Sequence, residues 1–95
     1  MKIDISTSFR EKLNSQIEYI AKDKPGAARK FKVELLKIIK EIPAMPYRNR
    51  KSIFFDDQEI RDMVYKGYIV VYRIVAKDET IQVFGFTKYE EDLHM

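Results

Sequence analysis

The spacing of apolar residues changes once along the chain, near Ser52. Before this point apolar residues recur at intervals of three and four, which is the period of an amphipathic helix. After it they form short runs between turn residues, which is typical of strands. Ile3 and Ile5 alternate with polar residues at the start. We therefore expect a short strand from Lys2 to Ser6, a helical segment, and then a strand-rich half.

The first predicted helix begins at Ser8. The sequence Ser8-Phe-Arg-Glu11 matches a capping box, in which the serine accepts a hydrogen bond from the third helical N–H and the glutamate reaches back to the serine N–H. The helix is expected to end at Asp23-Lys-Pro-Gly26. One face of it carries the apolar residues Phe9, Leu13, Ile17 and Ile20.

A second helix is expected from Pro25 to Pro43, because proline is tolerated in the first turn of a helix and breaks its interior. Its apolar face consists of Ala27, Ala28, Phe31, Leu35, Ile38 and Ile42. Two antiparallel helices with a short connection form a hairpin. The second half of the chain must then cover both apolar faces.

The second half predicts sequential strands separated by tight turns, and such strands form an antiparallel meander. The predicted class is therefore α+β: an N-terminal strand, a two-helix hairpin and an antiparallel sheet with the helices packed on one face. Residues 1–95 are expected to form a single domain. The predicted strands are Ser52 to Asp56, Glu59 to Tyr65, Tyr68 to Ala76 and Thr80 to Phe86.

Composition narrows the class of protein. The 95 residues include 45% hydrophobic residues, enough for one core, and no cysteine, which excludes disulfides and a thiol nucleophile. No apolar run approaches the roughly 18 residues that span a bilayer, and we expect a cytoplasmic protein. The formal charge of +3 is too small to indicate a nucleic-acid binder by itself. Three positive charges are nevertheless concentrated at Arg48, Arg50 and Lys51.

Several fragments in a fixed order resemble the RelE/ParE superfamily of type II toxins. They are the short first strand, the hairpin with Ile-Glu-Tyr-Ile at 17–20 and Ala28-x-x-Phe31-x-x-x-Leu35-x-x-Ile38, the proline after it, and the run from Ile60 through Gly67-Tyr68 to Ile74. The resemblance spans nearly the whole chain. It implies a small cytosolic toxin, associated with plasmid stabilisation, that a cognate antitoxin holds inactive. Its target would be DNA gyrase (ParE-like) or mRNA on the ribosome (RelE-like).

The catalytic set that RelE-like ribonucleases use is largely missing. RNA cleavage by a 2′-hydroxyl requires an acid, a base and a cation for the developing phosphorane charge. Aligned on Gly67-Tyr68, the family's lysine positions hold Ile60 and Asp62, and the arginine after Gly-Tyr is Ile69. This favours the ParE-like, non-enzymatic alternative. If the chain is instead a RelE-like endoribonuclease, the substitutes would be Arg61, Arg73, Lys88 and Tyr89. A third alternative is a non-toxic module that only binds an antitoxin.

Surplus aromatic residues predict a surface for a partner, because one sheet face and two helices cannot bury all of them. We expect the target- or antitoxin-binding residues to be Arg48, Arg50, Lys51, Phe54, Phe84 and Phe86. Tyr65, Tyr68 and Tyr72 are interpreted as core-edge residues with wet hydroxyls rather than as platforms for bases. A strand arginine that faces inward, Arg61 or Arg73, would need a carboxylate such as Glu59.

No cofactor and no metal site is expected. The sequence has one histidine, His94, which is interpreted as part of a solvated C-terminal tail, and it has no cysteine. It also lacks a glycine-rich phosphate loop.

Overall fold

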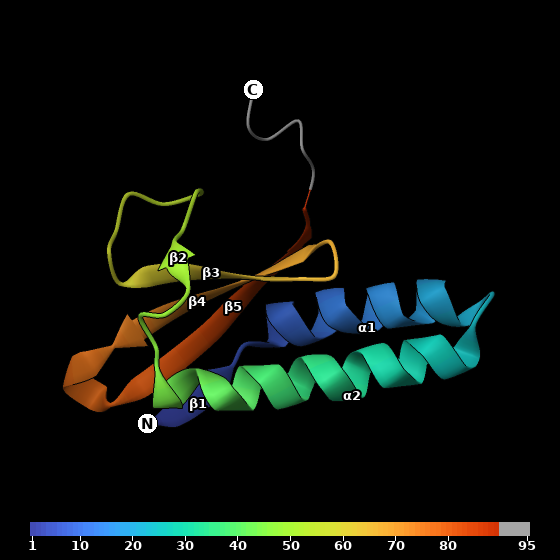
Figure 1. Ribbon diagram of the computed structural model, residues 1–95, viewed down its shortest axis with the longest axis horizontal. Coiled ribbons are helices and arrows are strands. Elements are labelled where there is room, and N and C mark those ends of the chain that lie inside the picture. Colours follow the sequence, from blue (N-terminus) through green and yellow to red (C-terminus); the bar gives the residue numbers. More distant parts are fainter. Residues whose placement is uncertain (90–95) are drawn as a thin grey trace.

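The computed structural model describes residues 1–89 and places two helices on one face of a mixed sheet (Figure 1). The sheet order is β1-β5-β4-β3-β2. This arrangement confirms the predicted α+β class with the helices on one side. The elements are β1 (Lys2–Ile5), α1 (Thr7–Ala21), α2 (Pro25–Glu41), a 3-10 turn (Ile42–Ala44), β2 (Arg50–Lys51), β3 (Ile60–Tyr65), β4 (Tyr68–Val75), a second 3-10 turn (Ala76–Asp78) and β5 (Thr80–Lys88).

The strands β3, β4 and β5 form the predicted antiparallel meander, and β1 joins it as a parallel neighbour of β5. The β3–β4 connection is a two-residue turn in which Lys66 and Gly67 both have positive φ, at 45° and 83°. Two consecutive positive φ angles match the right-handed twist of a hairpin, and glycine adopts them without a steric penalty. Within residues 1–89 no helix is long and apolar enough to cross a bilayer.

The first helix begins two residues earlier than predicted. Ser6, and not Ser8, is its N-cap, because the Ser6 Oγ accepts a hydrogen bond of 3.0 Å from the Phe9 N–H. The Ser6 N–H also donates to the Val83 carbonyl at 2.9 Å. Ser6 therefore ends the strand and starts the helix, and Ser8 lies inside the first turn. The capping-box prediction was wrong because it could not include this contact with a distant strand.

The predicted strand from Ser52 to Asp56 is a loop, and the short strand β2 precedes it. Pairing with β3 covers only Arg50 and Lys51, followed by one hydrogen bond from the Ser52 N–H to the Ile60 carbonyl at 2.8 Å. Beyond Ser52, side-chain oxygens of this loop bind its own backbone N–H groups. Such local bonds compete with a strand ladder, so the apolar run at 53–55 does not pair.

The main core lies between the helices and the sheet. Ile39 is fully buried there, whereas Ile38, which the sequence placed on the apolar face, is only partly buried. Tyr72 is also fully buried, and its hydroxyl donates to the Pro46 carbonyl at 2.6 Å and accepts from the Asn49 amide at 3.1 Å. The prediction of a wet hydroxyl is therefore wrong for Tyr72. The buried residues of this core are Phe9, Leu13, Phe31, Leu35, Ile39, Ile42, Met63, Val70, Tyr72, Ile74, Ile81, Val83 and Phe86.

A β-bulge in β5 decides which of its side chains face the helices. Val71 pairs with Gly85 and Tyr72 with Val83, so Phe84 is an extra residue without a partner in β4. The extra residue shifts the alternation by one. Val83 and Phe86 consequently both enter the main core, while Phe84 packs on the opposite face. A Cβ atom at Gly85 would lie 2.9 Å from the Val71 Cβ, so only glycine fits there without a shift.

The identity of the helix cap can be tested by two serine substitutions. Ser6→Ala should lower the free energy of unfolding by about 1 kcal/mol, because it removes the side-chain acceptor of an otherwise unsatisfied helical N–H. Ser8→Ala is the matched control and should change it by less than about 0.5 kcal/mol. Urea denaturation followed by circular dichroism measures both. A larger loss for Ser8→Ala would restore the capping box read from the sequence.

Candidate functional site

The sheet face opposite the helices carries a second apolar cluster. Ile60, Ile69 and Val71 are buried in it, and Phe84 and Tyr89 pack against it. The loop of residues 52–59 lies over this face: the ring of Phe55 meets that of Phe84 edge-on at 5.8 Å between centroids. The two helices pack on the other face of the sheet, and the loop shields part of this cluster.

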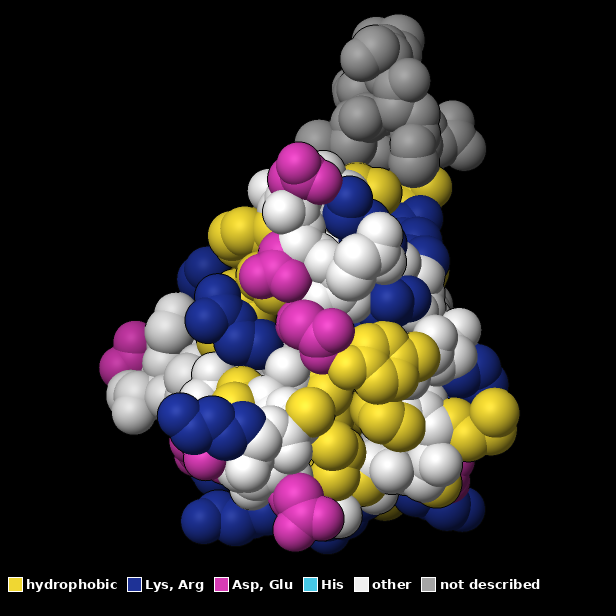
Figure 2. All heavy atoms as spheres, turned by 90° about the vertical axis from the view of Figure 1, so that its left-hand side faces the viewer, with side chains coloured by type: hydrophobic (Ala, Val, Ile, Leu, Met, Phe, Trp, Pro, Cys, Tyr) yellow, Lys and Arg dark blue, Asp and Glu magenta, His cyan; other side chains and the backbone are white. Residues whose placement is uncertain are grey.

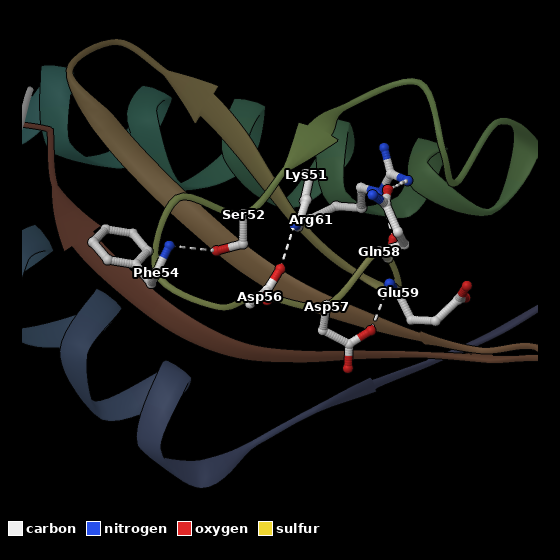
Figure 3. A network of polar contacts seen from close by, with 8 residues as sticks. All are labelled: Lys51, Ser52, Phe54, Asp56, Asp57, Gln58, Glu59 and Arg61. Carbon is white, nitrogen blue, oxygen red and sulfur yellow. Dashed lines mark hydrogen bonds and ion pairs between the residues drawn. The ribbon is translucent and has the colours of Figure 1, made fainter.

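The loop is held by bonds from its own side chains and from β3 (Figure 3). Lys51 Nζ contacts Asp56 Oδ1 at 2.7 Å, and this hydrogen bond lowers the pKa of the Asp56 carboxyl. Further bonds run from Phe54 N–H to Ser52 Oγ at 3.1 Å, from Glu59 N–H to Asp57 Oδ1 at 2.9 Å, and from Arg61 Nε to the Gln58 carbonyl at 2.9 Å. The loop is therefore a defined structure, although it has no regular ladder.

Three consecutive apolar side chains of this loop remain in water. Ile53 is 44%, Phe54 41% and Phe55 43% exposed. Figure 2 shows the side of the molecule on which the loop and β2 lie, where hydrophobic side chains gather between acidic and basic ones. An exposed apolar group on a loop held by several hydrogen bonds is typical of an interaction surface, since little ordering entropy remains to be lost on binding.

Asp62 anchors the loop from the middle of β3. Its side chain is buried, and Oδ2 accepts a hydrogen bond of 3.0 Å from the Ile53 N–H and lies 3.6 Å from an Arg50 guanidinium nitrogen. Its Oδ1 has no hydrogen-bond partner among the described residues. Removing a buried carboxylate of this kind leaves the donor that it satisfied without a partner.

The three predicted basic residues have different environments. Arg50 pairs with Asp62 and lies over the ring of Tyr89 at 5.7 Å from its centroid, and Lys51 pairs with Asp56. Their side chains are nevertheless 38% and 39% exposed. Arg48 is exposed and makes no side-chain hydrogen bond or ion pair within residues 1–89. The structure thus ties two of the three charges to the fold and leaves the third available.

The four residues named as catalytic substitutes do not converge. By strand alternation, Arg61 and Lys88 lie on the helix side of the sheet, whereas Arg73 and Tyr89 lie on the opposite side. A sheet separates the two pairs, so one phosphate cannot meet all four. Arg73 is exposed beside Gln82, its partner in β5.

Arg61 has a structural environment that the sequence did not predict. Backbone oxygens take the place of the expected carboxylate. The Arg61 guanidinium donates to the carbonyls of Gln58 and Asn49 at 2.9 and 3.1 Å, and it lies 5.1 Å from the centroid of the Tyr47 ring. The Tyr47 hydroxyl in turn donates to Glu59, and this hydrogen bond raises the pKa of Tyr47. Arg61 therefore joins the ends of two loops.

Two other predicted positions are core residues. Ile69 occupies the position after Gly67-Tyr68 at which the resemblance to RelE-like ribonucleases implies an arginine. It is fully buried in the cluster that contains Ile60 and Val71. Phe86 is 6% exposed, stacks on Tyr68 at 5.2 Å and meets Phe9 edge-on at 5.6 Å. Phe86 thus belongs to the helix-side core, which corrects its prediction as an open binding residue alongside Phe54 and Phe84.

Within residues 1–89, no group of three or more His, Asp or Glu side chains is placed to hold a metal ion. His94 lies outside the described residues.

Comparison with known proteins identifies one matching protein family, and the match covers nearly the whole chain. The family model described as "ParE toxin of type II toxin-antitoxin system, parDE" matches residues 3–93. No curated protein matches the sequence.

The anchoring role of Asp62 leads to a test. Asp62→Ala should lower the free energy of unfolding by about 1–3 kcal/mol, because the Ile53 N–H loses its acceptor in a buried position. The exposed pair provides the control: the Asp56 side chain is fully exposed, so Asp56→Ala should lower the free energy of unfolding much less than Asp62→Ala does. Denaturant unfolding measures both values. Equal, small losses in the two variants would mean that the loop does not depend on Asp62.

Proposed function

The chain belongs to the ParE toxin family of type II toxin–antitoxin systems, and from this premise we propose that it arrests bacterial growth by binding DNA gyrase in the cytoplasm. A cognate antitoxin neutralises it by covering part of its surface. Toxicity then requires complementarity to a macromolecular target and no bond-breaking chemistry in the toxin itself.

The separation of Arg61 and Lys88 from Arg73 and Tyr89 is the observation that supports gyrase over RNA as the target. Cleavage of RNA requires an acid, a base and a cation within reach of one phosphate. Here the candidate groups lie on opposite faces of the sheet, and the buried Ile69 occupies the position after Gly67-Tyr68. A binding mechanism needs only an ordered surface, and the apolar loop at 53–55 supplies one.

The antitoxin is proposed to bring acidic residues to the basic segment Arg48, Arg50 and Lys51, and apolar residues to the surface that the sheet and hairpin leave uncovered. Arg50 and Lys51 already have carboxylate partners, so an antitoxin carboxylate would share them. Within residues 1–89 Arg48 has no such partner, so it would gain most from a new ion pair. Folding of a disordered acidic segment on binding would match the charge and hide apolar area.

The target is tested with one preparation of the full chain in two assays. We expect inhibition of gyrase supercoiling and accumulation of gyrase–DNA cleavage complexes on a gel, without codon-specific mRNA cuts on ribosomes by primer extension. Induced expression without any antitoxin should arrest growth.

The opposite results separate the alternatives. Ribosome-dependent cleavage would establish a RelE-like ribonuclease, and alanine substitution of Arg61, Arg73, Lys88 and Tyr89 would then identify its groups. Normal growth with soluble protein present would favour a non-toxic antitoxin-binding module.

Charge reversal in the basic segment tests antitoxin binding. Against the antitoxin encoded in the same operon, Arg48→Glu should weaken binding about tenfold, because the variant replaces an attraction by a repulsion. Lys77→Glu reverses a charge outside this segment, in the turn before β5, and serves as the control with unchanged affinity. Isothermal titration calorimetry at two salt concentrations measures the affinities. Equal affinities of the Arg48 variant and the parent would remove this segment from the interface.

A further inference from the structure

The helix α2 carries a concentration of positive charge. It contains five lysines and arginines and two glutamates, and the resulting net charge of +3 equals the formal charge of the whole chain. The rest of the sequence is therefore neutral in sum. A small net charge can hide a locally basic surface, and the positions of these residues around the helix decide whether one exists.

Most of these cations lie on one side of α2. With about 3.6 residues per turn, each residue is rotated by about 100° from the one before it, so residues 29, 30, 37 and 40 fall within an arc of about 100°. The residues that α2 buries in the core lie on the opposite side, and they are Ala28, Phe31, Leu35 and Ile39. We term the exposed side the basic face of α2, and it consists of Arg29, Lys30, Lys37 and Lys40.

The fold does not neutralise the basic face. Both glutamates of α2 lie outside the arc, and Glu34 Oε2 already accepts a hydrogen bond of 2.6 Å from the Tyr65 hydroxyl and lies 3.3 Å from Lys66 Nζ. The other oxygen of Glu34 is 4.0 Å from Lys30 Nζ. Within residues 1–89 this is the one ion pair that the basic face makes. Val33, which is 63% exposed, lies in the middle of the face.

The spacing of the cations suits a regular polyanion. A rise of about 1.5 Å per residue places Arg29 and Lys40 about 16 Å apart along the helix axis, and Lys30 and Lys37 about 10 Å apart. Each strand of duplex DNA has a phosphate about every 3.4 Å along its axis. The basic face can therefore lie beside several phosphates of one duplex at the same time.

Other anionic partners fit this face less well. Single-stranded nucleic acid is bound by aromatic side chains that stack on bases, and the one aromatic residue of α2, Phe31, is buried. A helix that lies on an anionic membrane inserts bulky apolar residues beside its cationic face, whereas the large apolar residues of α2 lie against the core. A rigid surface of charge without bases or acyl chains to contact is the feature that a DNA duplex offers.

We propose that the basic face of α2 binds the phosphate backbone of duplex DNA without preference for its sequence. Contacts to phosphates hold a protein on the duplex but carry no information about the bases. This face is separate from the segment Arg48 to Lys51 and from the apolar loop at 53–55. The proposal goes beyond the inhibition of gyrase and does not require it, because the partner is the DNA itself.

The experiment uses the full chain and a fluorescein-labelled duplex of 20 base pairs, with no gyrase present. Fluorescence anisotropy measures the association constant between 50 and 200 mM NaCl. Four phosphate contacts should give a plot of log K against log salt with a slope of about −3 to −4, which is a loss of about 100-fold over this range. A second duplex of shuffled sequence should bind equally.

Two variants with the same net charge separate the basic face from the charge of the whole protein. Each loses four exposed positive side chains, so the formal charge changes from +3 to −1 in both. The face variant combines Arg29→Gln, Lys30→Gln, Lys37→Gln and Lys40→Gln. The control variant combines Lys2→Gln, Lys12→Gln, Lys32→Gln and Lys77→Gln.

The face variant should bind at least about tenfold more weakly than the control variant at 50 mM NaCl, and its salt slope should approach zero. The control variant should keep the slope of the parent, because its phosphate contacts are intact. Circular dichroism shows that both variants fold.

Three results would overturn the proposal. The first is the absence of binding by the folded parent at 50 mM NaCl, which would leave the basic face to a partner of another class, such as an acidic protein. The second is an equal loss of affinity in the two variants, which would assign binding to net charge. The third is binding of a single strand of the same length as tightly as the duplex, or a tenfold preference for one of the two duplex sequences, since either would require contacts to bases.

Discussion

The bulge at Phe84, opposite Val71, is the constraint on which both faces of the sheet depend. In a strand of strict alternation, Val83 and Phe86 would point to opposite faces, and one of the two would be lost from the main core. The extra residue brings both to the helices, where Phe86 completes an aromatic group with Phe9 and Tyr68. The bulge requires glycine at position 85, because the Val71 side chain lies where the Cβ atom of any larger residue would be.

The same bulge shapes the opposite face. Phe84 is directed away from the helices and meets Phe55, so the loop of residues 52–59 has an aromatic support in β5 as well as the buried anchor Asp62 in β3. A buried carboxylate is costly unless it is hydrogen-bonded and paired. The nearby Arg50 and the Ile53 N–H provide that compensation, and the loop is the element that benefits. Exposed apolar residues at 53–55 thus rest on two fixed points of the sheet.

The distribution of charge suits recognition better than catalysis. Arg61 is committed to backbone oxygens, and Arg50 and Lys51 to carboxylates, whereas Arg48 and Arg73 are exposed. Charges dispersed over separate faces can attract partners from several directions, but they do not concentrate a field on one bond.

The sequence by itself determined the class of the fold, most of its helices and strands, and the family. Apolar spacing of three and four located both helices, the Lys66-Gly67 turn located the hairpin, and the order of these fragments indicated a RelE/ParE-type toxin, because each signal depends on residues close together in the chain. Tertiary structure decided the rest. The hydrogen bond from the Ser6 N–H to the Val83 carbonyl fixes Ser6 as the point where the strand ends and the helix begins. Residues 53–55 do not pair with the sheet, because local side-chain bonds compete with the ladder. The Arg61 guanidinium donates to the carbonyls of Gln58 and Asn49, which lie in two different loops. Phe84 and Phe86 look equivalent in the sequence, yet a one-residue bulge puts the first beside the loop and the second in the core. These outcomes depend on contacts between distant segments, and such contacts exist only once the chain has folded.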